Sequence, residues 1–108
     1  MGMLGTKEII KEVNDAVNKD EVFIQGTSET PEIQLNKNNG EIKFSGRSMP
    51  EDAKGFYNPL KEWIKNYSND PKQGTKVIFA YEYFNTASSK MIMELIETVK
   101  MIGEKDPD

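Results

Sequence analysis

The 108-residue sequence contains no cysteine and no histidine. Without cysteine, the chain cannot form disulfides, thiolate zinc sites or a cysteine nucleophile. Without histidine, it lacks the usual general base, proton shuttle and metal ligand. Without either side chain few common catalytic mechanisms remain, so we expect a protein that is not an enzyme and that needs no metal or cofactor.

The sequence also has little surplus charge and no long apolar run. Fourteen Lys and Arg residues stand against eighteen Asp and Glu, for a net charge of −4, and the two signs are interleaved. No basic stripe is present that could follow a nucleic-acid backbone. No apolar run approaches the ~20 residues of a membrane span, and no signal peptide is visible. We therefore expect a cytoplasmic protein without nucleic-acid or membrane partners.

The first half of the chain predicts one helix and three short strands. Residues 6–18 carry apolar residues at helical spacing, and residues 21–26 and 32–35 read as strands. Asn38-Asn39-Gly40 is a strong turn signal, and apolar and polar residues alternate after it over residues 41–45. The apolar helical face consists of Ile9, Ile10, Val13, Ala16 and Val17.

The middle of the chain predicts a helix interrupted by proline. Ser48 and Glu51 have the spacing of a capping box. Pro59 disfavours one unbroken helix, so we expect a short turn through Phe56 and a second helical piece that starts at Pro59, with Asn58 as its cap.

The last third predicts a strand and a long helix. Residues 75–84 carry apolar side chains on both faces, which is typical of a central strand covered on both sides, or of one covered on one side plus a partner. Residues 88–103 form an amphipathic helix, for which Gly103 is a candidate stop. Its predicted buried stripe is Met91, Ile92, Leu95, Ile96, Val99 and Ile102. The pattern as a whole predicts a small α/β domain.

The junction between that strand and that helix gathers polar side chains at Asn85, Thr86, Ser88, Ser89 and Lys90. The first turn of a helix has free N–H groups and partial positive charge, so it accepts anions. A phosphate on a hydroxyl here would add about −1.5 to −2 charge, which those amides and Lys90 could hold. The simpler interpretation is that Thr86 or Ser88 caps the helix. The residues alone favour the cap, because polar caps are common.

Three residues are candidate partner contacts: Tyr57, Arg47 and Tyr83. Tyr57 could belong to an exposed aromatic anchor with Phe56 and Trp63, although packing in the core is the commoner fate of such residues. Arg47 is the single arginine of the chain. It is either an ordinary surface charge or a partner for an acidic group or a phosphate.

Four motifs, in one consistent order over roughly residues 21–102, resemble the SiaC family of bacterial regulatory phosphoproteins. This family is similar in fold to the STAS domains of anti-sigma factor antagonists. The resemblance implies a mixed sheet of about four strands with two main helices, over residues 21–103. Residues 1–20 would add an N-terminal helix, and residues 104–108 a tail. The motifs are Thr30-Pro31-Glu32-Ile33, Gly46-Arg47-Ser48-Met49-Pro50-Glu51, Phe56-Tyr57-Asn58-Pro59-Leu60 with Trp63, and Tyr83-Phe84-Asn85-Thr86-Ala87-Ser88-Ser89-Lys90.

The same resemblance implies a partner-switching pathway in biofilm and cyclic-di-GMP signalling. A cognate kinase phosphorylates the threonine that maps onto Thr86, and a PP2C-type phosphatase removes the phosphate. The unmodified form binds and activates a diguanylate cyclase. The chain departs from the family at Ala87, where another Ser is usual. Family members also generally continue past the last helix into a further strand and an acidic segment, and they begin after the N-terminal helix.

A second hypothesis is a constitutive oligomer, such as a homodimer, without a phosphorylation switch. Its interface would be the N-terminal helix, including Ile10 and Val13. In that case the polar junction would simply be a capped helix start.

Overall fold

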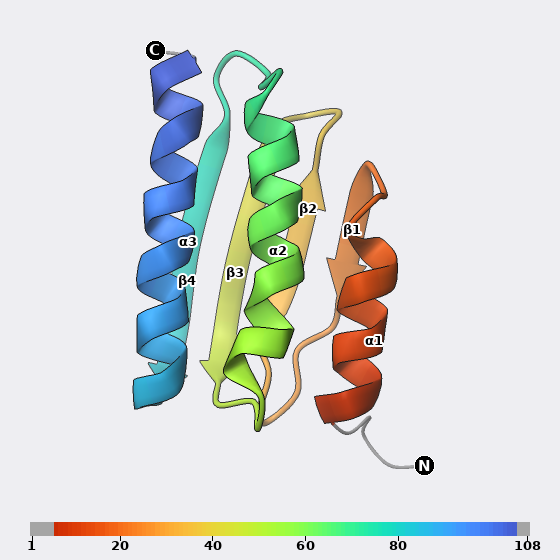
Figure 1. Cartoon of the computed structure of the whole chain (residues 1–108), viewed down its shortest axis with the longest axis vertical. Coiled ribbons are helices and arrows are strands. Elements are labelled where there is room, and N and C mark those ends of the chain that lie inside the picture. Colours follow the sequence, from red (N-terminus) through yellow and green to blue (C-terminus); the bar gives the residue numbers. More distant parts are fainter. Residues whose placement is uncertain (1–5, 106–108) are drawn as a thin grey trace.

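The computed structural model of the chain describes residues 6–105, and the side chains of residues 7–103. The described helices lie side by side on one face of a four-stranded sheet (Figure 1). This architecture confirms the predicted α/β class. In chain order the elements are α1 (Thr6–Ala16), β1 (Glu21–Ile24), β2 (Glu32–Asn36), β3 (Glu41–Ser48), α2 (Ala53–Ser68), β4 (Lys76–Phe84) and α3 (Thr86–Lys105).

The sheet has the order β1-β2-β3-β4 and is mixed. β1, β2 and β3 pair antiparallel, and the turn between β2 and β3 places Gly40 at a φ of 73°, where glycine is favoured. β4 pairs parallel with β3, and α2 provides the crossover between them. β3 and β4 therefore end at the same edge of the molecule, where β4 leads into α3.

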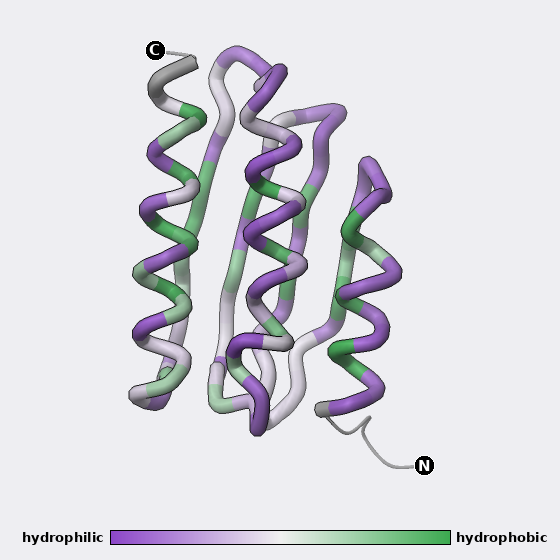
Figure 2. The backbone as a smooth tube through the Cα atoms, viewed as in Figure 1, coloured by the Kyte–Doolittle hydropathy of each residue, from purple (hydrophilic) through white to green (hydrophobic). Residues whose placement is uncertain are grey.

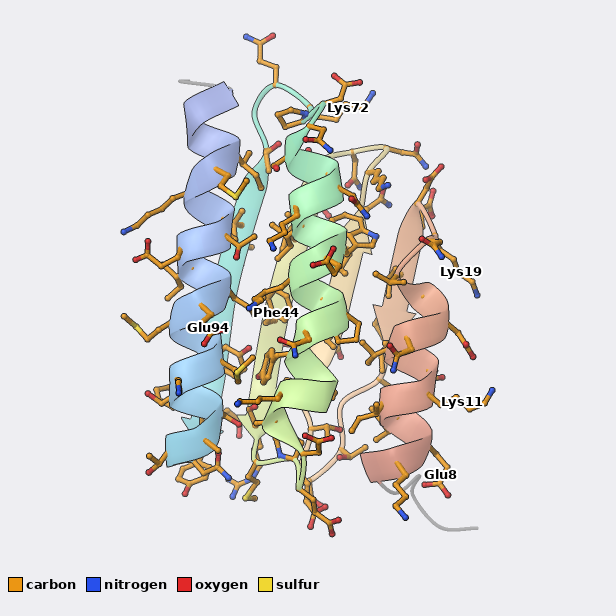
Figure 3. All side chains as sticks on the ribbon, viewed as in Figure 1. Glu8, Lys11, Lys19, Phe44, Lys72 and Glu94 are labelled. Atoms are coloured by element: carbon orange, nitrogen blue, oxygen red, sulfur yellow. The ribbon has the colours of Figure 1, made fainter. Side chains whose placement is uncertain are left out.

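The core lies between the sheet and the helix layer. Alternate residues of the strands point toward the helices, among them Ile33 of β2 and Phe44 of β3, both 0% exposed. Figure 3 shows Phe44 beneath α2, and its ring stacks on that of Phe79 from β4, with the centroids 5.5 Å apart. Along the helices, apolar segments alternate with polar ones at the helical period (Figure 2). The predicted apolar face of α1 is also confirmed, because Ile9 and Val13 are buried.

α2 corrects two predictions. It runs without interruption through Pro59, although Pro59 cannot donate a backbone hydrogen bond. The apolar stripe continues on both sides of the proline, and burying it outweighs the missing bond. Asp52, not Ser48, caps the helix by accepting a hydrogen bond from the Gly55 N–H at 3.0 Å. The predicted capping box is therefore wrong, since Ser48 is the last residue of β3. The buried stripe of α2 comprises Phe56, Tyr57, Leu60, Trp63, Ile64 and Tyr67.

The last two elements also differ from their predictions. β4 is an edge strand and pairs only with β3 among the described strands. Of the two predicted alternatives, the central strand covered on both sides is therefore wrong, and a strand covered on one side plus a partner stays a prediction. α3 continues past Gly103 to Lys105, so Gly103 is not a helix stop. The predicted tail thus contains two helical residues, and residues 106–108 lie outside the described part of the chain.

α1 lies at the edge of the molecule opposite α3 (Figure 1). It packs against α2 and β1 and buries its apolar face within its own chain. Within residues 6–105, no helix is both long and apolar enough to cross a lipid bilayer.

Candidate functional site

The candidate site is the short connection from β4 to α3. Thr86 is the first residue of α3, and it is exposed. The Asn85 N–H donates to the Ser48 carbonyl at 3.1 Å, which ties the connection to the end of β3. The Asn85 side-chain oxygen accepts a hydrogen bond from the Ser88 N–H at 2.9 Å. Asn85 is therefore the cap, and the prediction that Thr86 or Ser88 caps the helix is wrong.

This arrangement leaves the Thr86 hydroxyl without a structural task. A helix cap needs one side-chain acceptor for the amides of the first turn, and Asn85 provides it. The remaining free N–H groups of that turn belong to Thr86 and Ala87 and form the positive end of the helix dipole. Lys90 follows one turn later and is exposed. An anion on Thr86 would thus meet N–H groups and a cation, with no carboxylate in the first turn of the helix.

Ser88 lies behind the site, in the core, and is 0% exposed. It accepts a hydrogen bond from the Ser48 hydroxyl at 2.9 Å. The Ser48 oxygen lies 2.6 Å from the hydroxyl of Tyr57, which lies 3.1 Å from that of Tyr81. Because Ser48 donates its one proton to Ser88, the hydrogen bonds run from Tyr81 through Tyr57 and Ser48 to Ser88. This buried hydroxyl chain joins β4, α2 and β3 to the first turn of α3.

The two tyrosines of the hydroxyl chain remain neutral. Burial raises the pKa of the Tyr57 hydroxyl above its usual value. Burial and the neighbouring Tyr57 oxygen also raise the pKa of Tyr81. Both groups therefore act as hydrogen-bonding hydroxyls, and their role in this site is to position the start of α3.

Sequence reasoning missed this chain because its members are far apart in the sequence. The spacing of Ser48 to Glu51 also fits a cap for the following helix. One signal was present: Ser48 continues the inward alternation of Ile42 and Phe44 in β3, so it should point toward the helices.

The three candidate partner contacts separate into two groups. Tyr57 is 0% exposed, so the prediction that it forms an exposed anchor is wrong; its ring packs edge-on against Phe56. Arg47 and Tyr83 are exposed and face each other across β3 and β4. The Arg47 guanidinium lies 5.2 Å from the centroid of the Tyr83 ring, and its Nε donates to the Ser28 carbonyl at 3.3 Å. The parallel strand ends thus bring Arg47 to the end of the sheet where Thr86 lies.

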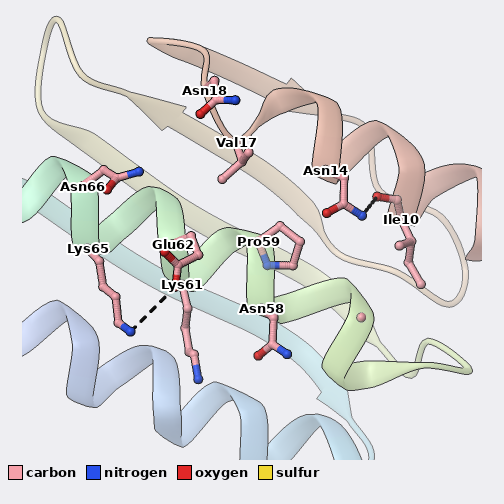
Figure 4. A pocket seen from close by; sticks show the side chains of 11 residues that line it. Ile10, Asn14, Val17, Asn18, Asn58, Pro59, Lys61, Glu62, Lys65 and Asn66 are labelled. Carbon is pink, nitrogen blue, oxygen red and sulfur yellow. Dashed lines mark hydrogen bonds and ion pairs between the residues drawn. The ribbon is translucent and has the colours of Figure 1, made fainter.

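A groove between α1 and α2 lies away from the connection of β4 to α3 (Figure 4). It has a volume of about 680 Å³ and is lined by Ile10 and Val17 of α1, by Pro59 of α2, and by several asparagines and lysines. None of its lining residues belongs to β4 or α3. In the described part of the chain, no three Asp or Glu side chains are grouped as metal ligands would be.

Comparisons with known proteins agree with the resemblance seen in the sequence. The model of the SiaC family of regulatory phosphoproteins matches residues 24–108. The fold is similar to that of SiaC of Pseudomonas aeruginosa, with a TM-score of 0.70 and 24% identity, over 78% of this chain and 69% of that one. A crystal structure of the diguanylate cyclase SiaD in complex with its activator SiaC, from the same organism, gives a TM-score of 0.69 and 24% identity, over 77% and 68%.

A curated relative, an uncharacterized protein of Pseudomonas aeruginosa (strain UCBPP-PA14), is 25% identical over 80 residues. The match covers 74% of this chain and 64% of the relative. The chain therefore spans less than two thirds of the length of that relative.

Proposed function

The chain belongs to the SiaC family of regulatory phosphoproteins, and on that basis we propose that it is a non-catalytic binding module controlled by phosphorylation of Thr86. A cognate kinase adds the phosphate and a PP2C-type phosphatase removes it. The unmodified protein binds an effector of the diguanylate cyclase class. The solved complex of SiaC with SiaD supports this choice of effector, since SiaC is described there as the activator of that cyclase.

The exposed position of Thr86 is the observation that carries the proposal. A kinase must reach the hydroxyl, and the Thr86 side chain lies on the surface at the start of α3. Asn85 holds the first turn in place through its bond to the Ser88 N–H. Modification of Thr86 therefore breaks no hydrogen bond that the helix needs, and the domain stays folded in both states.

The switch acts through charge at this surface. An added phosphate carries about −1.5 to −2 charge at neutral pH. On the protein itself, the helix N-terminus and Lys90 stabilise it. In an interface with an effector, the same dianion must lose its hydration and repels acidic groups. A loss of about 3 kcal/mol in binding free energy weakens an affinity by more than a hundredfold, which suffices for a switch.

The experiment compares the affinities of four proteins for the diguanylate cyclase of the same organism: wild type, Thr86→Ala, Thr86→Gln and Thr86→Glu. Wild type and Thr86→Ala should bind alike, because the hydroxyl is not a cap. Thr86→Glu should bind at least about tenfold more weakly. Thr86→Gln matches it in size and should retain most of the affinity. Equal binding of all four would contradict the proposal.

The constitutive oligomer is less well supported. Its interface was expected on α1, including Ile10 and Val13. Val13 is buried within the same chain, whereas Ile10 is half-buried and lines the groove between α1 and α2. Light scattering of the wild-type protein tests for a dimer directly.

A further inference from the structure

Lysines outnumber carboxylates where α2 and α3 pack side by side. The Glu94 carboxylate of α3 lies 2.7 Å from the Lys61 ammonium of α2. The hydrogen bond and charge of Lys61 lower the pKa of the Glu94 carboxyl, and the charges of Lys90 and Lys54 lower it further. Among the side chains of residues 7–103, neither Lys54 nor Lys90 forms an ion pair. Two of the three cations that act on Glu94 are therefore unpaired.

The register of the two helices places Lys54 close to Thr86. α2 and α3 run in the same direction and begin at the same end of the sheet (Figure 1). Lys54 precedes Lys61 by the same number of residues as Ala87 precedes Glu94, and this spacing is almost two helical turns. Lys54 therefore points in nearly the same direction as Lys61 and faces Ala87 across the helix pair. Ala87 offers it only a methyl group, and the next side chain is that of Thr86.

A phosphate on Thr86 has the length to reach an ammonium at this position. In phosphothreonine, as many bonds separate Cα from a terminal phosphate oxygen as separate Cα from a carboxylate oxygen in glutamate. The contact of Lys61 with Glu94 shows that side chains of these lengths meet across the two helices. Lys54 and a phosphorylated Thr86 would repeat that contact about two turns earlier.

The remaining charges around Thr86 favour the same contact. Lys90 lies one helical turn after Thr86 and is exposed, so it borders the phosphate position from α3. The acidic residues nearest to Lys54 in the sequence are Glu51 and Asp52. Asp52 accepts the hydrogen bond that caps α2, and neither carboxylate lies within ion-pair distance of a described lysine. Both lysines are thus available to a new anion.

We propose that Lys54 of α2, together with Lys90 of α3, binds the phosphate of phosphorylated Thr86. The inference rests on the proposed function, which supplies the phosphate, and it adds a residue of α2 to the site. The phosphate then joins the starts of α2 and α3, as the ion pair of Lys61 and Glu94 joins the same helices farther along. The surface that changes on phosphorylation therefore includes the start of α2.

The test uses the full chain with phosphothreonine incorporated at position 86 by genetic code expansion, so that no kinase is needed. Phosphorus NMR at a series of pH values measures the second pKa of the phosphate, which is about 6 without such contacts. In the phosphoprotein this pKa should be lower, because nearby cations favour the dianion. Lys54→Gln and Lys90→Gln should each raise it by about 0.3–0.5, the size expected of an exposed ion pair.

Lys65→Gln is the matched control, because Lys65 is also an exposed lysine of α2 but lies roughly 16 Å farther along the helix than Lys54. This distance exceeds the screening length of about 8 Å at physiological salt, so the phosphate pKa should stay the same. Circular dichroism verifies that each variant is folded. The inference is overturned if Lys54→Gln leaves the phosphate pKa unchanged, or if Lys65→Gln raises it equally.

The affinity of the same phosphoprotein for the diguanylate cyclase tests the proposed function separately. If phosphorylation weakens binding but Lys54→Gln leaves the phosphate pKa unchanged, the switch stands and the inference about Lys54 fails. If Lys54→Gln raises the phosphate pKa but phosphorylation leaves the affinity unchanged, Lys54 binds the phosphate and the proposed switch fails.

Discussion

The starts of α2 and α3 are built alike and differ in charge. In both, the residue before the helix accepts a hydrogen bond from the third N–H that follows it: Asp52 from Gly55 at 3.0 Å, and Asn85 from Ser88 at 2.9 Å. Each cap satisfies one amide of the first turn. The geometry of capping is therefore not what makes one of these sites a candidate switch.

The difference lies in what surrounds each cap. At α2 the cap is a carboxylate and Glu51 precedes it, so negative charge already neutralises the positive end of the helix. At α3 the cap is a neutral amide, followed by the exposed Thr86 hydroxyl. Negative charge already compensates the helix dipole at the start of α2, whereas the start of α3 can accept a new anion. This comparison explains why a phosphate would be tolerated at α3 and repelled at α2.

The largest expected effect comes from the hydroxyl chain behind the α3 start, which has no counterpart at α2. Ser48→Ala removes the group that joins Tyr57 to Ser88 and leaves a buried hydroxyl without its donor. The free energy of unfolding should fall by about 2–3 kcal/mol, as measured by urea denaturation. Ser45→Ala, three residues earlier on the opposite face of β3, is the control and should change it by less than about 0.5 kcal/mol. Equal effects of the two substitutions would refute the structural role of the chain.

The two caps should contribute similar hydrogen bonds in the unmodified protein. Asp52→Ala and Asn85→Ala each remove one hydrogen bond to a first-turn amide. Each should lower the free energy of unfolding by about 1 kcal/mol, and Asp52→Ala by about 0.3–1 kcal/mol more because it also removes a negative charge at the helix N-terminus, measured by thermal or urea denaturation. A loss at only one of the two positions would show that the caps do not share one function.

A charge placed on the α3 cap should separate the two helix starts. Asn85→Asp keeps the acceptor and adds a negative charge at the helix N-terminus, which should stabilise the protein by about 0.3–1 kcal/mol. Combined with Thr86→Glu, this gain should shrink or reverse, because two neighbouring carboxylates repel. Strict additivity in the double-mutant cycle would mean that this helix start does not sense charge at Thr86.

The smallest expected effect concerns the ion pair between Lys61 of α2 and Glu94 of α3. The hydrogen bond and charge of Lys61 lower the pKa of the Glu94 carboxyl. A lowered pKa means that the native state favours the ionised form, so the stabilisation is present above the ordinary glutamate pKa and is lost as pH falls through the native pKa. Wild type should therefore be slightly more stable than Glu94→Gln at neutral pH. The difference between their denaturation midpoints should disappear as the pH is lowered.

Local patterns predicted most of the elements. The alternation in β1 to β3 and the apolar stripes of α1 and α3 depend on neighbours within the same segment, and the structure confirms them. Pro59 was misleading because its local cost is outweighed by burial of the α2 stripe on both sides. Gly103 likewise lies within α3, which continues through it.

The errors that mattered for the site came from pairings across long distances in the sequence. The position of β4 at the edge depends on which strand joins the sheet last, and an apolar pattern does not contain that information. The sequence pattern did not join Ser48 and Tyr57 in one hydroxyl chain, because their partners, Ser88 and Tyr81, lie 40 and 24 residues away. Thr86 came from the resemblance to the SiaC family, and its phosphorylation remains a prediction.

Phosphate mapping by mass spectrometry, on the protein isolated from the organism that produces it, tests the central claim most directly. The account predicts a form that carries a single phosphate on Thr86, and the absence of this form from a strain with the Thr86→Ala substitution. A phosphate on another residue, or a protein that is never phosphorylated while its kinase and phosphatase are present, would contradict it.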